Sequence, residues 1–96
     1  MTVKILIATI TTTPEHVDTV KTALVAAVAA VRKEAGCERY DLHHDADNQN
    51  RFVMVERWSN QTALTDHANG AAFQKLAATL TDRATLEIIN LVEISQ

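Results

Sequence analysis

The 96-residue sequence contains only one cysteine, two glycines and one proline. With Cys37 alone no intrachain disulfide can form, so we expect a protein of the reducing cytoplasm. Gly36 and Gly70 lie too far apart to form a phosphate-cradling loop, which excludes the usual nucleotide and flavin fingerprints. We therefore expect any reaction to use only the protein's side chains and the substrate itself, without a cofactor.

The sequence also lacks a long apolar run and any cluster of basic residues. Its longest apolar stretch, 23–31, is far below the roughly 20 residues of a membrane-spanning helix. The first ten residues lack a charged leader and a cleavage-like site, so we expect them to form a strand and not a signal peptide. The net charge is -3, and nine scattered cations with 4% aromatics do not suit nucleic-acid binding. Neither a membrane nor a nucleic acid is an expected partner.

Metal and nucleophile patterns are equally scarce. His43 and His44 are adjacent on a predicted strand, so their side chains point to opposite faces, and no further His or Cys falls at ligand spacing. No serine is flanked by glycines, and Cys37 directly follows the glycine predicted to end a helix. We expect no metal site, and we interpret Cys37 as a small apolar filler.

Hydrophobic periodicity predicts one domain over residues 1–96, with the order strand, helix, strand, strand, helix, strand. The predicted elements are a strand at 3–10, a helix from a cap at Thr13 to a stop at Gly36, strands at 37–45 and 51–59, a helical region from Ser59 or Asn60 to Leu80 interrupted at 69–70, and a strand at 85–94. This βαββαβ order predicts an α+β, ferredoxin-like fold, with a four-stranded antiparallel sheet and helices on one face.

The predicted strands are apolar on both faces. Ile7 points opposite to Leu6, and Val55 points opposite to Met54. Because two helices can cover only one face, the other would remain a large apolar patch, which favours a sheet-to-sheet homodimer. A chain of this size buries only roughly 60 to 65% of its unfolded surface, so a partner subunit would help it.

Polar residues interrupt this apolar pattern in the segment Arg51–Phe73. On the predicted strand, Glu56 and Trp58 share a face with Met54, so an acid and an indole sit in an apolar row. On the following helix His67 is three residues after Leu64, which places the imidazole on the apolar face. An inward carboxylate needs a partner, so we expect Glu56 to pair with His67 or a neighbour of Arg57, or to face a wet cavity.

The predicted hairpin brings Tyr40 beside Glu56 and Trp58, and the inward helix adds His67. Together they offer a titratable imidazole, a carboxylate and aromatic walls for a flat ligand. The same residues have plainer interpretations, since His67 is also consistent with a hydrogen-bonded core residue and Trp58 with a core filler. The residues alone do not decide between a functional site and an ordinary core.

The segments EAGCERY at 34–40, RFVMVERW at 51–58 and ALTDH at 63–67, with the aromatic Phe73, resemble a known family. They are similar to the antibiotic-biosynthesis-monooxygenase-like domains of the dimeric α+β barrel superfamily, and the similarity covers nearly the whole chain. The resemblance implies ferredoxin-like protomers paired sheet to sheet in small cytoplasmic proteins. It also implies that some members oxidise quinols or polyketide phenols with dioxygen, without metal or flavin.

The resemblance assigns roles to individual residues. Glu56, Trp58 and His67 match the family's recurring strand Glu-x-Trp and helix His, and Tyr40 matches its usual strand aromatic. It implies that His67 and Glu56 are catalytic. It also implies that Trp58, Tyr40 and Phe73 bind the substrate.

The sequence departs from the family pattern at one position. Many members carry a second His directly before the phenylalanine, where this chain has Ala72. Haem-degrading relatives use an asparagine on the first strand, where this chain has Ala8, Thr9 and Ile10, so haem cleavage is not expected.

The leading hypothesis is a cofactor-independent monooxygenase acting on a small quinol or polyketide-like phenol. His67, oriented by Glu56, would remove the phenolic proton, and the resulting anion would pass an electron to dioxygen. One alternative is a module that binds or isomerises a small molecule without oxygen chemistry. Another is a non-catalytic dimeric domain whose cavity is closed by its own side chains.

Overall fold

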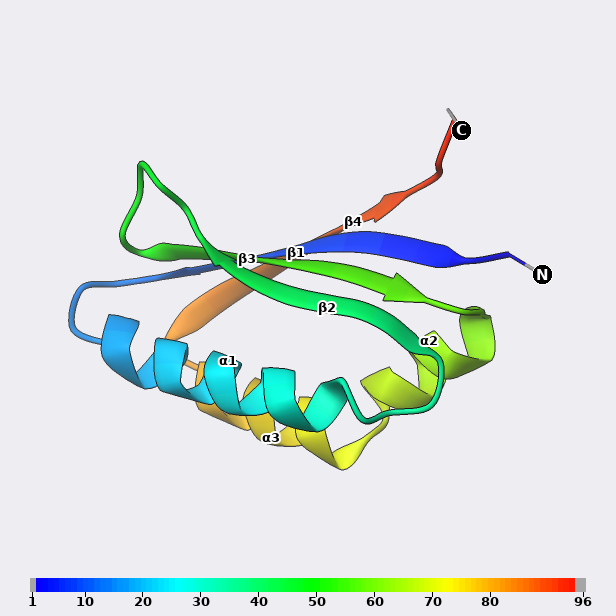
Figure 1. Cartoon of the computed structure of the whole chain (residues 1–96). Helices are drawn as coiled ribbons and strands as arrows, with labels where there is room; N and C mark the ends of the chain where they lie inside the picture. Colours follow the sequence, from blue (N-terminus) through cyan, green and yellow to red (C-terminus); the bar gives the residue numbers. More distant parts are fainter. Residues whose placement is uncertain (1, 95–96) are drawn as a thin grey trace.

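A four-stranded antiparallel sheet carries three helices on one face (Figure 1). The computed structural model describes residues 2–94. Its elements in chain order are β1 (Lys4–Thr12), α1 (Val17–Val31), β2 (Cys37–His44), β3 (Arg51–Trp58), α2 (Gln61–Ala68), α3 (Ala71–Leu80) and β4 (Ala84–Leu91). This arrangement confirms the predicted ferredoxin-like fold.

The sheet order β2-β3-β1-β4 places the strand that carries Glu56 in the interior of the sheet. Glu56 on β3 is paired with Leu6 on β1 and with Tyr40 on β2. Because directly paired residues project from the same face, Tyr40 and Glu56 lie side by side on the face that the helices cover. The predicted hairpin neighbourhood is therefore confirmed.

The core lies between this face and the helices. Every second residue of β3 is buried, including Phe52, Met54 and Trp58, as expected when one face of a strand meets a hydrophobic layer. Helix α1 contributes Leu24 and Val31, which are fully buried. The apolar residues that alternate along the strands and those that recur at helical spacing on α1 thus pack against each other in one core.

Helix α1 begins later than the sequence predicts. Its first residue is Val17 and its N-cap is His16, which makes no side-chain cap. A turn precedes it, in which the His16 N–H donates to the Thr13 carbonyl at 3.0 Å. Helix α1 ends at Val31 and is followed by tight turns up to Gly36, whose φ of 80° is the predicted left-handed conformation. The turn residues 32–36 bring the chain close to α2.

The second helical region matches the prediction more closely. Asn60 is the N-cap of α2, and its Oδ1 accepts the Ala63 N–H at 2.9 Å. The region breaks at Asn69 and Gly70, which separate α2 from α3. No helix in residues 2–94 is long and apolar enough to cross a membrane.

Strand β4 lies at an edge of the sheet, and its apolar side chains are exposed on both faces. Leu86 and Ile88, on the helix-facing side, are 38% and 50% exposed. Ile89 and Leu91, on the opposite side, are 56% and 41% exposed. Among the strands, the exposed large apolar side chains are thus concentrated on β4.

Candidate functional site

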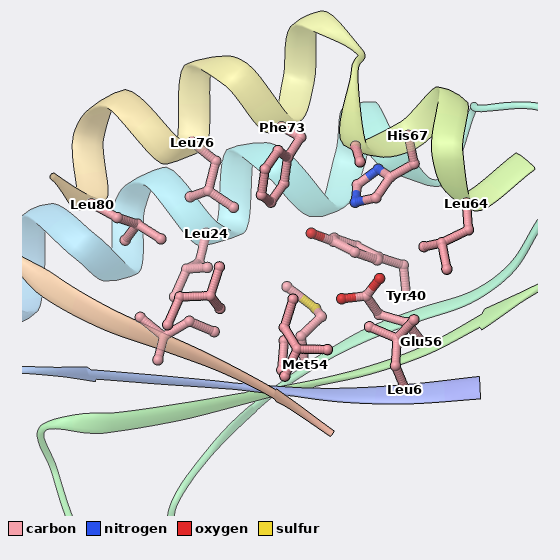
Figure 2. Close-up of a pocket in the computed structure, with 15 residues that line it drawn as sticks. Leu6, Leu24, Tyr40, Met54, Glu56, Leu64, His67, Phe73, Leu76 and Leu80 are labelled. Atoms are coloured by element: carbon pink, nitrogen blue, oxygen red, sulfur yellow. The ribbon is translucent and has the colours of Figure 1, made fainter. Parts of the chain in front are cut away.

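A cavity of about 90 Å³ lies between the sheet and the helices (Figure 2). Its wall is almost entirely apolar, with contributions from all three helices and all four strands. Its polar side chains are Tyr40, Glu56 and His67. Leu24, Leu76 and Leu80 line the other end. The cavity is therefore polar at one end and hydrocarbon-like along the rest of its length.

His67 projects inward from α2, as its spacing from Leu64 predicts, and is 5% exposed. Three aromatic rings surround its imidazole. Trp58 stacks on it at 4.5 Å between ring centroids, while Phe73 and Tyr40 meet it edge to face at 5.5 and 5.6 Å. These contacts leave the ring few orientations.

The hydrogen-bond partner of His67 is Glu34, a residue that sequence reasoning missed. His67 Nδ1 and Glu34 Oε1 are 2.8 Å apart. Glu34 lies in the turn after α1, where its own N–H donates to the Val31 carbonyl at 2.9 Å. A carboxylate can only accept, so with Glu34 ionised the imidazole donates from Nδ1 and keeps Nε2 as an acceptor. The only signals in the sequence were the place of Glu34 in EAGCERY and the nearby Gly36.

Glu56 has a different partner from the predicted one. It is 5% exposed, and its Oε1 accepts a hydrogen bond from Trp58 Nε1 at 3.0 Å. The two residues are two apart on one strand face, so the indole reaches the carboxyl directly. The expected orientation of His67 by Glu56 is therefore wrong, because the imidazole nitrogen is already held by Glu34.

Burial raises the pKa of Glu56, and this effect exceeds the lowering by the Trp58 hydrogen bond and by the positive charge on His67. Burial also raises the pKa of Tyr40, and the negative charges of Glu56 and Glu34 raise it further. The phenol of Tyr40 therefore stays neutral and able to donate. Figure 2 shows its ring extending into the cavity beneath His67.

The aromatic residues proposed for substrate binding fall into two groups. Tyr40 and Phe73 line the cavity, whereas Trp58 has no exposed surface and lies behind the wall. Ala72 is half-buried against the core and places no second imidazole beside Phe73. Within residues 2–94, no group of three or more His, Cys, Asp and Glu side chains gathers closely enough to hold a metal ion. The arrangement suits removal of a proton from a hydroxyl group on an apolar ligand.

Comparison with known proteins gives results in agreement with this fold. The family model described as antibiotic biosynthesis monooxygenase matches residues 4–79. The crystal structure of PA3566 from Pseudomonas aeruginosa is similar with a TM-score of 0.92 and 35% identity, over 99% of this chain and 97% of that one.

Two further proteins are informative. The Bacillus subtilis (strain 168) protein "Putative monooxygenase YcnE" is 38% identical over 47 residues, which are 49% of this chain and 50% of YcnE. The chain thus matches about half the length of that curated relative. SnoaB, a cofactor-independent oxygenase from Streptomyces nogalater, has a TM-score of 0.84 over 98% of this chain and 95% of its own. At 16% identity this likeness shows the fold alone.

Proposed function

The chain belongs to the antibiotic biosynthesis monooxygenase family, and we propose that it is a cofactor-independent monooxygenase that oxidises a small quinol or phenol with dioxygen in the cytoplasm. The observation that carries the proposal is His67, a buried imidazole held at Nδ1 and lining an apolar cavity. The name of YcnE, a putative monooxygenase, supports the reaction class.

The lining of the cavity favours a substrate that is polar at one end and apolar along the rest. Tyr40, Glu56 and His67 gather at one side, and the remaining wall offers only hydrocarbon contacts. A phenolic hydroxyl would lie at the polar end, and the ring would fill the apolar part, where Phe73 supplies an aromatic wall. Additional hydroxyl groups at the far end would lose their hydration without gaining partners.

The proposed reaction begins with proton transfer from the phenol to Nε2 of His67. The phenolate passes one electron to dioxygen, and the phenoxyl radical and superoxide then combine into a peroxide at a ring carbon. Glu56 lines the same end of the cavity, and burial raises its pKa; in its protonated form Glu56 would supply the proton that the peroxide takes up. Loss of water gives the quinone, with one oxygen atom of dioxygen in the product and one in water.

The remaining steps restore the site. His67 returns the phenolic proton to Glu56, so no net proton is exchanged with solvent. The neutral phenol of Tyr40 can donate a hydrogen bond to the developing phenolate oxygen, a stabilisation available without a cofactor. An internal cavity also counts against the alternative of a domain closed by its own side chains.

The proposed assembly is a homodimer formed through the uncovered face of the sheet. Ile89 is paired with Ile7 there, and Val55 lies on the adjoining strand, so the apolar surface crosses three strands. Ile89 and Leu91 are 56% and 41% exposed, which leaves large apolar side chains in water unless a partner covers them. A second copy of the chain is the simplest partner, since it presents the same surface.

Oxygen consumption tests the proposed reaction. The purified protein is supplied with hydroquinols and phenols of increasing ring number in an oxygen electrode, alongside His67→Ala and His43→Ala. His43 is an exposed histidine outside the site and serves as the matched control. We expect turnover with wild type and His43→Ala, and a loss of about 10²- to 10⁴-fold in His67→Ala. Substrate conversion under anaerobic conditions would instead support the non-oxidative alternative.

A further inference from the structure

We infer that Glu34 is the positioning residue of this site, and that its carboxylate fixes His67 in the tautomer whose Nε2 accepts a proton from the cavity. The catalytic use of that nitrogen rests on the proposed function. The positioning itself rests on the contacts of Glu34 and His67 and can be measured without a substrate.

His67 lies at a boundary between two hollows. It lines the internal cavity together with Tyr40 and Glu56. It also lines a surface hollow on its other side, which Glu34, Asp66 and Gly70 help to form. The hydrogen bond from Nδ1 points to Glu34, which lines the surface hollow, so Nε2 is the nitrogen left for the cavity (Figure 2).

Of the two carboxyl groups near His67, Glu34 is the one suited to hold it. The side chain of Glu34 is 25% exposed, so it keeps part of its hydration while it accepts the imidazole N–H. Glu56 is 5% exposed and already accepts the indole N–H of Trp58. A charge that keeps its contact with water costs less to maintain, and it stabilises the imidazolium that forms when Nε2 takes a proton.

Both glycines of the chain lie where the turn that carries Glu34 meets α2. A Cβ at Gly36 would collide with the Cβ of Ala63 and lie 2.7 Å from Ser59 Oγ. A Cβ at Gly70 would lie 3.5 Å from Glu34 Oε2. The positive φ of Gly36 and its close approach to α2 therefore set the distance that lets Glu34 reach His67 across 33 residues of sequence.

The first test is the tautomer of His67 in the substrate-free protein, read from the imidazole ¹⁵N chemical shifts by NMR at a pH where the ring is neutral. We expect wild type to carry the proton on Nδ1. We expect Glu34→Ala to give a mixture of tautomers, because no acceptor remains for Nδ1. Glu34→Gln keeps an acceptor oxygen without the charge, so it should retain the wild-type tautomer.

A matched control distinguishes the loss of the Glu34–His67 contact from the loss of any negative charge in the surface hollow. Asp66 is exposed on α2 and lines the same surface hollow, so Asp66→Asn should leave the His67 shifts unchanged. A wild-type proton on Nε2 would overturn the inference without any variant. Identical His67 shifts in wild type and Glu34→Ala would overturn it as well.

Kinetics then distinguish positioning from a structural role. We expect Glu34→Gln and Glu34→Ala to lower kcat by about 10- to 100-fold with little change in KM, and Glu34→Asp to recover part of the loss. Equal losses of kcat in all three variants, with KM raised in parallel, would contradict a positioning role.

If oxygen uptake is absent but the tautomer of His67 responds to Glu34→Ala, the proposed function fails and the positioning role of Glu34 stands. If oxygen uptake depends on His67 but the tautomer does not respond, the positioning fails alone.

Discussion

The imidazole of His67 stacks on the indole of Trp58, with ring centroids 4.5 Å apart and 28° between the planes. The same indole donates its N–H to Glu56 at 3.0 Å. Trp58 therefore contacts the proposed base with its face and the buried acid with its edge. Although it does not line the cavity, it fixes the two ionisable groups relative to each other.

The hydrogen bond between Trp58 and Glu56 should be visible in a double-mutant cycle. Trp58→Phe keeps an aromatic ring against His67 but removes the N–H donor. We expect the Trp58–Glu56 coupling energy, measured by urea unfolding with Glu56→Leu, which has no acceptor, and the double variant, to be about 1 kcal/mol or more. A coupling energy near zero would show that the bond contributes no stability.

The stability of the fold should respond to the protonation of Glu56. Burial raises the pKa of Glu56 in the folded chain above its ordinary value of 4.5, so the folded state binds this proton more tightly than the unfolded state. The resulting stabilisation is fully present below the unfolded pKa and is lost as the pH rises through the folded pKa.

The variant Glu56→Gln keeps an acceptor for Trp58 and cannot ionise. We expect its Tm to exceed that of wild type at pH 7, and the difference to shrink as the pH falls towards 4. Glu38→Gln is the control, because Glu38 is exposed and pairs with Arg57 at the surface. A Glu56→Gln variant less stable than wild type at pH 7 would contradict the burial argument.

Gly36→Ala should weaken the fold at the turn that carries Glu34. The new methyl group would meet Ala63, and the φ of 80° disfavours any residue with a Cβ. We expect a loss of about 2 kcal/mol or more in the free energy of unfolding, measured with urea. Gly70→Ala is the comparison, since Gly70 has a φ of -81° and its nearest contacts are at 3.2 Å or more. Equal losses in the two variants would contradict this account of Gly36.

The homodimer should depend on the uncovered face of the sheet. We expect light scattering to give twice the mass of the 10.6 kDa chain for wild type. Ile89→Glu should shift the protein to monomer, because it introduces a charge in the proposed interface. Val25→Glu is the matched control, since Val25 is 54% exposed but lies on α1, away from that face. A monomeric wild type would exclude the dimer at the concentrations used.

Much of the fold follows from short-range patterns in the sequence. Alternation identified the buried face of β3, and the polar turn after β2 predicted the hairpin that places Tyr40 beside Glu56. The spacing of Leu64 and His67 predicted an inward imidazole, which the structure confirms. These features are local, because each depends on residues a few positions apart.

The parts that the sequence could not supply depend on tertiary contacts. Glu34 lies beyond the last apolar residue of α1, so no periodicity indicates that it meets His67. The alternating apolar pattern of β3 placed Trp58 on the correct face of the sheet, but it carries no information on how deeply a side chain is buried. Trp58 lies behind the cavity wall. The late start of α1 reflects a separate turn before Val17, in which the His16 N–H donates to the Thr13 carbonyl.

The fate of the two oxygen atoms tests the proposed function most directly. A phenol or quinol that supports oxygen uptake is incubated with the protein under ¹⁸O₂, and the product is analysed by mass spectrometry. The account predicts one ¹⁸O atom in the quinone, with the other recovered in water, and loss of this incorporation in His67→Ala. A quinone without ¹⁸O, or equal incorporation in His67→Ala, would contradict it.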